Sequence, residues 1–243
     1  RKPIMARKDI LTKNHLKIII VVDRSGSMAG TPITQVNAAM GPLKKKLSKT
    51  AEENNVELEI KVIVFSDNAQ CIVGTEDTFE SIENFNWQDI TAEGGTSTPR
   101  ALKLVNDALK FDGNEVVHQL KPVVILLTDG GCNPSEIPAY RNEIEKLKTK
   151  LSGGTGREKV VRIGIGVGDY DEAQIAEFAS VGRINDKDVS LVFRVDHAED
   201  LAEVINWVAD SSIYPSVHPG QDEVFDMGEI DEEWLTEEDI EEA

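Results

Sequence analysis

The chain has 243 residues, of which 40% are hydrophobic and 29% are charged, proportions typical of a folded protein that is large enough for one α/β domain. Asp and Glu outnumber Lys and Arg by 44 to 26, so the formal net charge is −18. A nucleic-acid-binding protein needs a basic face to neutralise phosphates, and anionic membrane surfaces attract basic segments. The composition therefore argues against both kinds of partner.

The acidic residues are concentrated at one end of the chain. Residues 217–243 contain 12 acidic side chains and no Lys or Arg, which leaves a net charge of −6 on residues 1–216. The first thirteen residues are polar and basic instead. We therefore expect a flexible basic segment (1–13), one folded domain (14–213) and an acidic tail (214–243) that is disordered or forms a short docking helix.

Short apolar strands alternate with longer amphipathic segments through the folded domain. The predicted strands are Leu16–Val22, Val56–Phe65, Gln70–Val73, Pro122–Thr128, Lys159–Val167 and Ser190–Val195. The predicted helices are Val36–Leu47, Thr98–Leu109, Ser135–Leu151, Asp171–Ser180 and Glu199–Asp210. This alternation predicts β-α-β crossovers in a doubly wound, mostly parallel sheet with helices on both faces. Gln70–Val73 is expected to be a short antiparallel edge strand.

Three polar clusters lie at or near the ends of predicted strands: Asp23–Ser27, Gly94–Thr98 and Thr128–Gly131. Ligands of doubly wound sheets bind outside the carboxyl ends of the strands, so we expect these clusters to share one rim. Each cluster by itself also fits an ordinary turn or helix cap. Together they offer three hydroxyls and two carboxylates, hard oxygen donors that suit Mg²⁺, Mn²⁺ or Ca²⁺. These candidate ligands are Asp23, Ser25, Ser27, Thr96 and Asp129.

This set resembles the metal-ion-dependent adhesion site (MIDAS) of the von Willebrand factor A (VWA) family. The D-x-S-x-S motif of the family is matched by Asp23, Ser25 and Ser27, its threonine by Thr96 and its later aspartate by Asp129. The resemblance implies that the three hydroxyls coordinate a divalent cation directly and that the two aspartates hold it through water or exchange roles. It also implies a protein that is not an enzyme and that recognises an Asp or Glu carboxylate of a partner. We expect Mg²⁺, with Ca²⁺ or Mn²⁺ as alternatives.

Within that family, His15–Met28, Gly30–Ile33 and Glu93–Leu102 resemble an intracellular bacterial subgroup, the TerY/YegL-like proteins linked to tellurium resistance and stress gene clusters. The resemblance implies a scaffold or regulator with a protein kinase and a PP2C-type phosphatase as partners. We expect a cytoplasmic location, because no apolar signal segment is evident and Cys71 and Cys132 are too few for a disulfide framework.

Two other functions use the same residues. A phosphohydrolase of the haloacid-dehalogenase type also has an aspartate after its first strand, a second one in a TDG context, and Mg²⁺. It needs a carboxylic acid two residues after the nucleophile, where this chain has Ser25. Alternatively, Cys132 could act as a redox or metalloid sensor beside Asp129.

The acidic tail contains apolar residues among its acids, including Phe225, Trp234 and Ile240. This pattern favours a docking segment for a basic-rimmed groove on a partner, with plain solubility as the alternative. A further hypothesis is that a tail carboxylate occupies the metal site of the same or a neighbouring molecule.

Overall fold

The computed structural model describes residues 13–109, 120–150, 160–184, 187–217 and 225–226. A central sheet has the strand order β3-β2-β1-β5-β6-β9, and β4 also pairs with β2. These strands are β1 (Asn14–Asp23), β2 (Val56–Phe65), β3 (Ala69–Val73), β4 (Glu80–Ser81), β5 (Val123–Thr128), β6 (Val161–Val167) and β9 (Val192–Val195). The pairs along β2-β1-β5-β6-β9 are parallel, whereas β3 and β4 are antiparallel to β2. The predicted doubly wound sheet with an antiparallel edge strand is confirmed.

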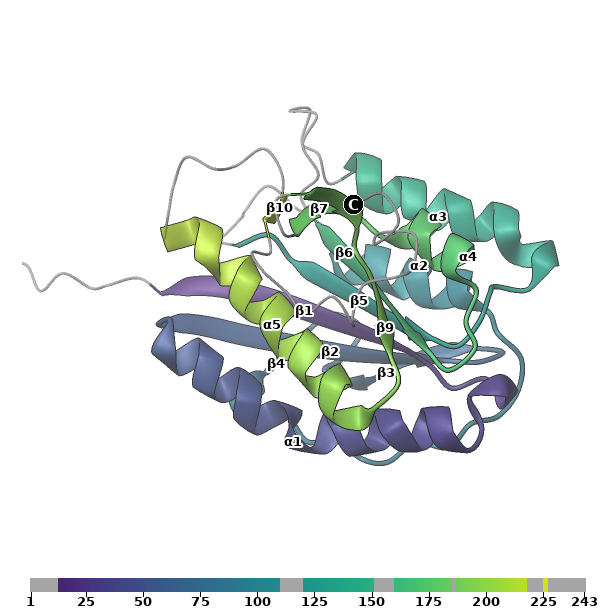
Figure 1. Ribbon diagram of the computed structural model, residues 1–243, viewed down its shortest axis with the longest axis horizontal. Coiled ribbons are helices and arrows are strands. Elements are labelled where there is room, and N and C mark those ends of the chain that lie inside the picture. Colours follow the sequence, from purple (N-terminus) through teal and green to yellow (C-terminus); the bar gives the residue numbers. More distant parts are fainter. Residues whose placement is uncertain (1–12, 110–119, 151–159, 185–186, 218–224, 227–243) are drawn as a thin grey trace, which may run out of the picture.

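Helices cover both faces of this sheet (Figure 1). One face is covered by α1 (Thr31–Glu53) and α5 (Ala198–Val217), and the other by α2 (Thr98–Ala108) and α3 (Ile137–Lys150). The short α4 (Glu172–Phe178) packs its Ile175 against Val192. Three single-turn 3₁₀ helices are Gly26–Met28, Ile82–Asn84 and Pro134–Glu136.

The two covered faces explain why β1 is apolar throughout its second half. Ile18, Ile20 and Val22 belong to the core beneath α1 and α5. Ile19 and Val21 point the opposite way, into the core beneath α2 and α3. A strand that is buried on both faces requires apolar residues at successive positions, whereas a half-exposed strand alternates. Asp23, at the end of β1, is therefore a buried polar residue in an apolar strand, and the candidate metal centre described below accounts for it.

A second, small sheet was not expected from the sequence. It contains β10 (Phe225–Asp226), β7 (Val181–Ile184) and β8 (Lys187–Ser190) in that order. The β7–β8 pair is antiparallel, and β10 pairs with β7 in parallel, so two residues of the acidic tail contact the folded domain. The tail was expected to be disordered or to form a short helix, but this pairing uses backbone groups, which carry no side-chain charge.

The last helix is also longer than predicted, because α5 continues to Val217, past the expected domain boundary at 213. The proposed tail helix and residues 1–12 of the basic segment lie outside the described residues. None of the described helices has both the length and the hydropathy required to cross a bilayer.

Candidate metal centre

The sheet brings the first and third polar clusters to one rim. Strands β1 and β5 are parallel neighbours, and the first ends at Asp23 while the second ends directly before Asp129. The Ser27 hydroxyl donates a hydrogen bond of 3.0 Å to Asp129 Oδ1, and the Ser25 and Ser27 hydroxyl oxygens lie 3.0 Å apart. Three of the five predicted residues, Ser25, Ser27 and Asp129, thus form one contiguous group of side-chain oxygen atoms, and Asp23 adjoins it through the Ser25 backbone N–H.

Asp23 is fully buried, and hydrogen bonds fix both of its carboxylate oxygens. The Ser25 backbone N–H donates to Oδ1 at 2.7 Å, and the Thr128 hydroxyl donates to Oδ2 at 2.7 Å. Burial raises the pKa of Asp23, and the charge of Asp129 adds to this increase, while the hydrogen bonds from Ser25 and Thr128 oppose it. The result is a rigidly held buried carboxylate whose charge is poorly solvated.

Asp129 has a related environment. Its side chain is buried, and burial raises its pKa, although the hydrogen bond from Ser27 opposes the shift. A cation that binds between or beside two such carboxylates lowers their raised pKa values, because it favours their charged forms. Ser27 is exposed, so solvent reaches this end of the group.

The loop that carries Thr96 lies directly against the loop after β1. The Glu93 N–H donates to the Arg24 carbonyl at 2.8 Å, and the Gly26 N–H donates to the Gly94 carbonyl at 2.9 Å. These two bonds bring Thr96, which is half-buried, to the same rim as the D-x-S-x-S motif. The structure therefore places the fifth predicted residue on a loop bound to the other cluster.

Asp67 fixes the conformation of this loop and was not identified from the sequence. Its Oδ1 accepts a hydrogen bond of 3.0 Å from the Gly95 N–H. Gly94 has a φ of +76°, and a Cβ added there would lie 2.5 Å from Asp67 Oδ2. Glycine is thus required both by the backbone conformation and by the close carboxylate. Asp67 follows β2, in a segment without any recognisable motif, so only the three-dimensional structure reveals this role.

Cys132 lies on the third cluster's loop but lacks the properties of a reactive thiol. Its side chain is 5% exposed, and burial, with a contribution from the charge of Glu136, raises its pKa to about 11. The thiol is therefore protonated at neutral pH, which argues against a fast redox sensor. Its backbone N–H donates to the Gln174 side chain, and the Tyr140 hydroxyl donates to the Gln174 carbonyl at 2.8 Å, so the loop is held against α4.

The chemistry of the donor set follows from these contacts. Within the described ranges, no group of three or more His, Cys, Asp or Glu side chains is arranged to hold a metal ion. The rim instead combines two carboxylates, Asp23 and Asp129, with the hydroxyls of Ser25, Ser27 and Thr96. Such oxygen donors fit a hard divalent cation, and their total charge of two negative units would not exceed that of the ion.

A doubly wound sheet with these three loops at one rim defines an α/β domain that presents its candidate site at the carboxyl ends of the parallel strands. Residues 17–207 match the von Willebrand factor type A domain family, and the chain belongs to this family. Such domains are typically metal-dependent protein-interaction modules.

The chain spans less than half the length of each of the similar proteins described next. Over 115 residues the chain is 30% identical to inter alpha-trypsin inhibitor heavy chain 4 of Mus musculus, which corresponds to 46% of this chain and 12% of that protein. The structure of proximal thread matrix protein 1 from the mussel byssus with a zinc-occupied MIDAS motif matches 83% of this chain and 46% of its own, with a TM-score of 0.54 and 22% identity. The pilus adhesin SpaC of Lactobacillus rhamnosus GG in its open conformation matches 84% of this chain and 30% of its own, with a TM-score of 0.57 and 18% identity. The two structural matches show a shared fold.

Proposed function

We propose that this domain recognises a protein partner through a divalent cation held at the rim. The proposed ligands are Asp23, Ser25, Ser27, Thr96 and Asp129. The observation that carries the proposal is the chain of contacts at the rim: the Ser25 N–H donates to buried Asp23, the Ser25 and Ser27 hydroxyls lie together, and Ser27 donates to Asp129. In this proposal the neutral hydroxyls of Ser25, Ser27 and Thr96 bind the cation directly and the two aspartates hold it through water. The cation therefore keeps positive charge in its inner shell and takes an Asp or Glu carboxylate of the partner as a further ligand. No covalent bond is made or broken.

The cation we propose is Mg²⁺, because all donors are hard oxygen atoms, with Ca²⁺ or Mn²⁺ as alternatives. Zn²⁺ belongs in the comparison because the mussel protein has a zinc-occupied MIDAS motif. The test is isothermal titration of the chelator-treated protein with each of the four cations. A saturable one-site isotherm for at least one of them supports the site, and no binding of any cation overturns it.

The partner's carboxylate is tested by affinity capture with Mg²⁺ or with EDTA. Wild type is compared with Asp23→Ala, and Asp89→Ala, at an exposed position, is the matched control. We expect wild type and the control to capture the same protein only when metal is present, and Asp23→Ala to capture it in neither condition. Capture that EDTA leaves unchanged would contradict the proposed mechanism.

We further propose that the protein acts in the cytoplasm of a bacterium, as a scaffold or regulator in a stress-response or tellurium-resistance complex with a protein kinase and a PP2C-type phosphatase. The support is the resemblance of His15–Met28 and Glu93–Leu102 to the TerY/YegL-like subgroup. Metal-dependent co-purification with either enzyme is the expected result. A partner that contains neither catalytic domain would refute this part of the proposal.

A metal-dependent phosphohydrolase is the competing class, and the geometry of Asp23 counts against it. An aspartate nucleophile needs an accessible oxygen for in-line attack, but both Asp23 oxygens accept hydrogen bonds in a fully buried position. Ser25 also supplies no carboxylic acid at the position where that mechanism needs a proton donor. Hydrolysis of p-nitrophenyl phosphate that requires Mg²⁺ and Asp23 would favour the enzyme.

A further inference from the structure

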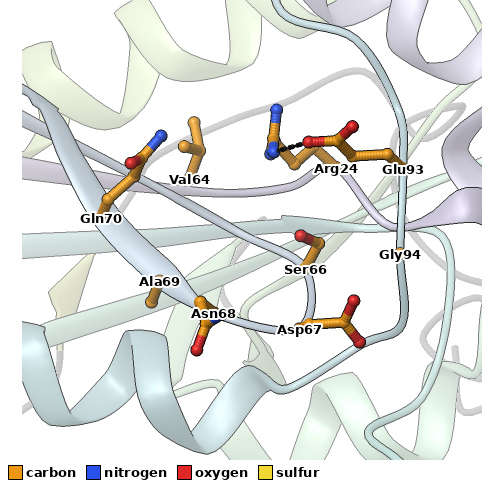
Figure 2. A pocket seen from close by; sticks show the side chains of 9 residues that line it. All are labelled: Arg24, Val64, Ser66, Asp67, Asn68, Ala69, Gln70, Glu93 and Gly94. Atoms are coloured by element: carbon orange, nitrogen blue, oxygen red, sulfur yellow. Dashed lines mark hydrogen bonds and ion pairs between the residues drawn. The ribbon is translucent and has the colours of Figure 1, made fainter.

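A pocket of ≈350 Å³ adjoins the candidate metal centre and has no role in holding the ion (Figure 2). Three of its residues belong to the metal-site loops, because Arg24 directly follows Asp23 and because Glu93 and Gly94 precede Thr96 on the same loop. The opposite wall comes from the end of β2, the start of β3 and the turn between them. The full lining is Arg24, Val64, Ser66, Asp67, Asn68, Ala69, Gln70, Glu93 and Gly94.

The charges on the wall favour a cation. The only cationic side chain, Arg24, is already paired with Glu93, and its guanidinium also donates to the Thr91 carbonyl at 3.4 Å. Asp67 adds a second carboxylate and uses Oδ1 to accept the Gly95 N–H. One guanidinium and two carboxylates give the lining a net charge of −1. An anion would have to displace Glu93 from Arg24, whereas a cation has acceptors left to use.

The uncharged lining suits a long side chain with a polar end. Ala69 is half-buried and supplies apolar surface beside which a methylene stem packs, whereas Val64 is 1% exposed and closes the floor of the pocket. Ser66 is 7% exposed, and Figure 2 shows its hydroxyl pointing toward the space between Gln70 and Arg24. Among the described residues, the Ser66 hydroxyl and the Gln70 side chain have no hydrogen-bond partner, so both are available to a donor from outside. A Lys or Arg side chain has this combination of apolar stem and donor groups.

We propose that this pocket receives a Lys or Arg side chain from the same partner whose carboxylate binds the metal. The inference rests on the proposed function and adds a second recognised group, a basic side chain, to the partner's carboxylate. The metal takes a negative group and the adjoining pocket takes a positive one. In an extended peptide, residues separated by one position point to the same side and lie roughly 6.5–7 Å apart. A short segment with an acidic and a basic residue in that arrangement presents both groups to a metal site and a pocket that adjoin at the loops of Arg24 and Gly94.

The probes are synthetic peptides that contain one aspartate and one variable residue two positions away. Each is made in both orders, as Asp-Ala-Xaa and Xaa-Ala-Asp, with Lys, Gln or Glu as Xaa, and is titrated by NMR into the full chain with Mg²⁺. In the favoured order we expect the Lys peptide to bind about two to five times more tightly than the Gln peptide, as is typical of partly exposed charge pairs. The Glu peptide is expected to bind most weakly.

Variants of Gln70 test whether the pocket causes this preference. Gln70→Lys should reduce the advantage of the Lys peptide, and Gln70→Glu should increase it. The matched controls are Gln88→Lys and Gln88→Glu, which make the same charge changes at an exposed glutamine outside the lining and should leave the preference unchanged. Mg²⁺ affinity of all four variants is measured separately, and we expect it to stay within about two-fold of wild type, because none of them alters a proposed ligand.

The outcomes separate the two levels of the proposal. Preference for the Glu peptide, or equal responses of the Gln70 and Gln88 variants, overturns the basic-residue pocket. If the Gln peptide still binds only with Mg²⁺, the metal-dependent recognition survives that failure. If Mg²⁺ binds the protein but every peptide fails to bind, both carboxylate recognition at the metal and the pocket proposal are wrong.

Discussion

Replacing Asp23 by Asn should separate metal binding from folding. The amide has almost the same shape as the carboxylate, and its oxygen can accept the hydrogen bond that the Ser25 N–H now donates at 2.7 Å. Its nitrogen can donate to the Thr128 hydroxyl oxygen, because that hydroxyl can direct its own hydrogen to the Gly130 carbonyl at 2.9 Å. The variant therefore keeps its buried polar groups satisfied and removes a charge whose pKa burial raises.

The size of the expected effect follows from linkage between metal binding and unfolding. A ligand present at 100 times its dissociation constant stabilises the folded state by about 2.7 kcal/mol. For a domain of this size, each 1 kcal/mol changes the midpoint of thermal unfolding by about 2–4 °C. Wild type should therefore gain about 5–11 °C on addition of the cation, whereas Asp23→Asn should gain close to nothing. Without metal the variant should unfold at the same temperature as wild type or higher.

Differential scanning calorimetry of both proteins, with EDTA and with saturating cation, measures these four midpoints. Asp89→Asn, at an exposed site, is the matched control and should respond to the cation as wild type does. An Asp23→Asn protein that keeps the full metal-induced increase would show that Asp23 does not contribute to the site. A large loss of stability without metal would show that the hydrogen-bond rearrangement at Thr128 does not occur.

Three further predictions concern neighbouring parts of the structure. Gly94→Ala should weaken cation binding and destabilise the fold by about 1–3 kcal/mol, because its φ of +76° and the nearby Asp67 carboxylate leave no room for a Cβ; unchanged titration and melting would contradict this. Glu177→Gln should lower the denaturation midpoint slightly at neutral pH, because the Arg141 guanidinium lowers the pKa of Glu177. That difference from wild type should vanish as the pH falls below 4.5 and through the lowered folded-state pKa, whereas a pH-independent difference would refute the ionic origin. Cys132 should react with iodoacetamide at pH 7.5 far more slowly than a free thiol, as followed by mass spectrometry, because its pKa is about 11; rapid alkylation of the folded protein would restore the sensor hypothesis.

The main sheet was predictable because its strands are buried on both faces. Continuous apolar runs such as Ile18–Val22 and Val123–Leu127 are too short for most helices and need two covered faces, which the alternating amphipathic segments supply. The β7–β8 pair escaped prediction because each strand has only four residues and its apolar pattern is weak. The β10–β7 pairing depends on backbone contact between residues that are far apart in the chain, which local patterning does not encode.

The same distinction applies to the candidate site. The D-x-S-x-S spacing is local, and the structure places its serine hydroxyl oxygens 3.0 Å apart. Residues outside this motif hold the site in place: Thr128 donates a hydrogen bond to Asp23, and Asp67 accepts one from Gly95 on the loop of Thr96. These contacts depend on the order of strands in the sheet and on how the loop after β2 turns, so residue spacing does not reveal them. Residue types therefore indicated the candidate donor atoms, and only the fold identified the residues that orient them.

The direction of α5 bears on the role of the acidic tail. The helix begins at Ala198, just after β9 ends at the metal-site rim, and its 20 residues extend about 30 Å at 1.5 Å per residue. The tail therefore begins at the opposite end of the sheet, where β10 pairs with β7 (Figure 1). Ser180, directly before β7, lies at the same end, because its N–H donates to the Arg162 carbonyl near the start of β6. A partner that docks on the first part of the tail and also binds the metal must extend over the length of the sheet. If the tail is a docking segment, it adds a second recognition surface at the far end of the domain, and deleting residues 218–243 should then weaken partner binding while the Mg²⁺ affinity stays unchanged.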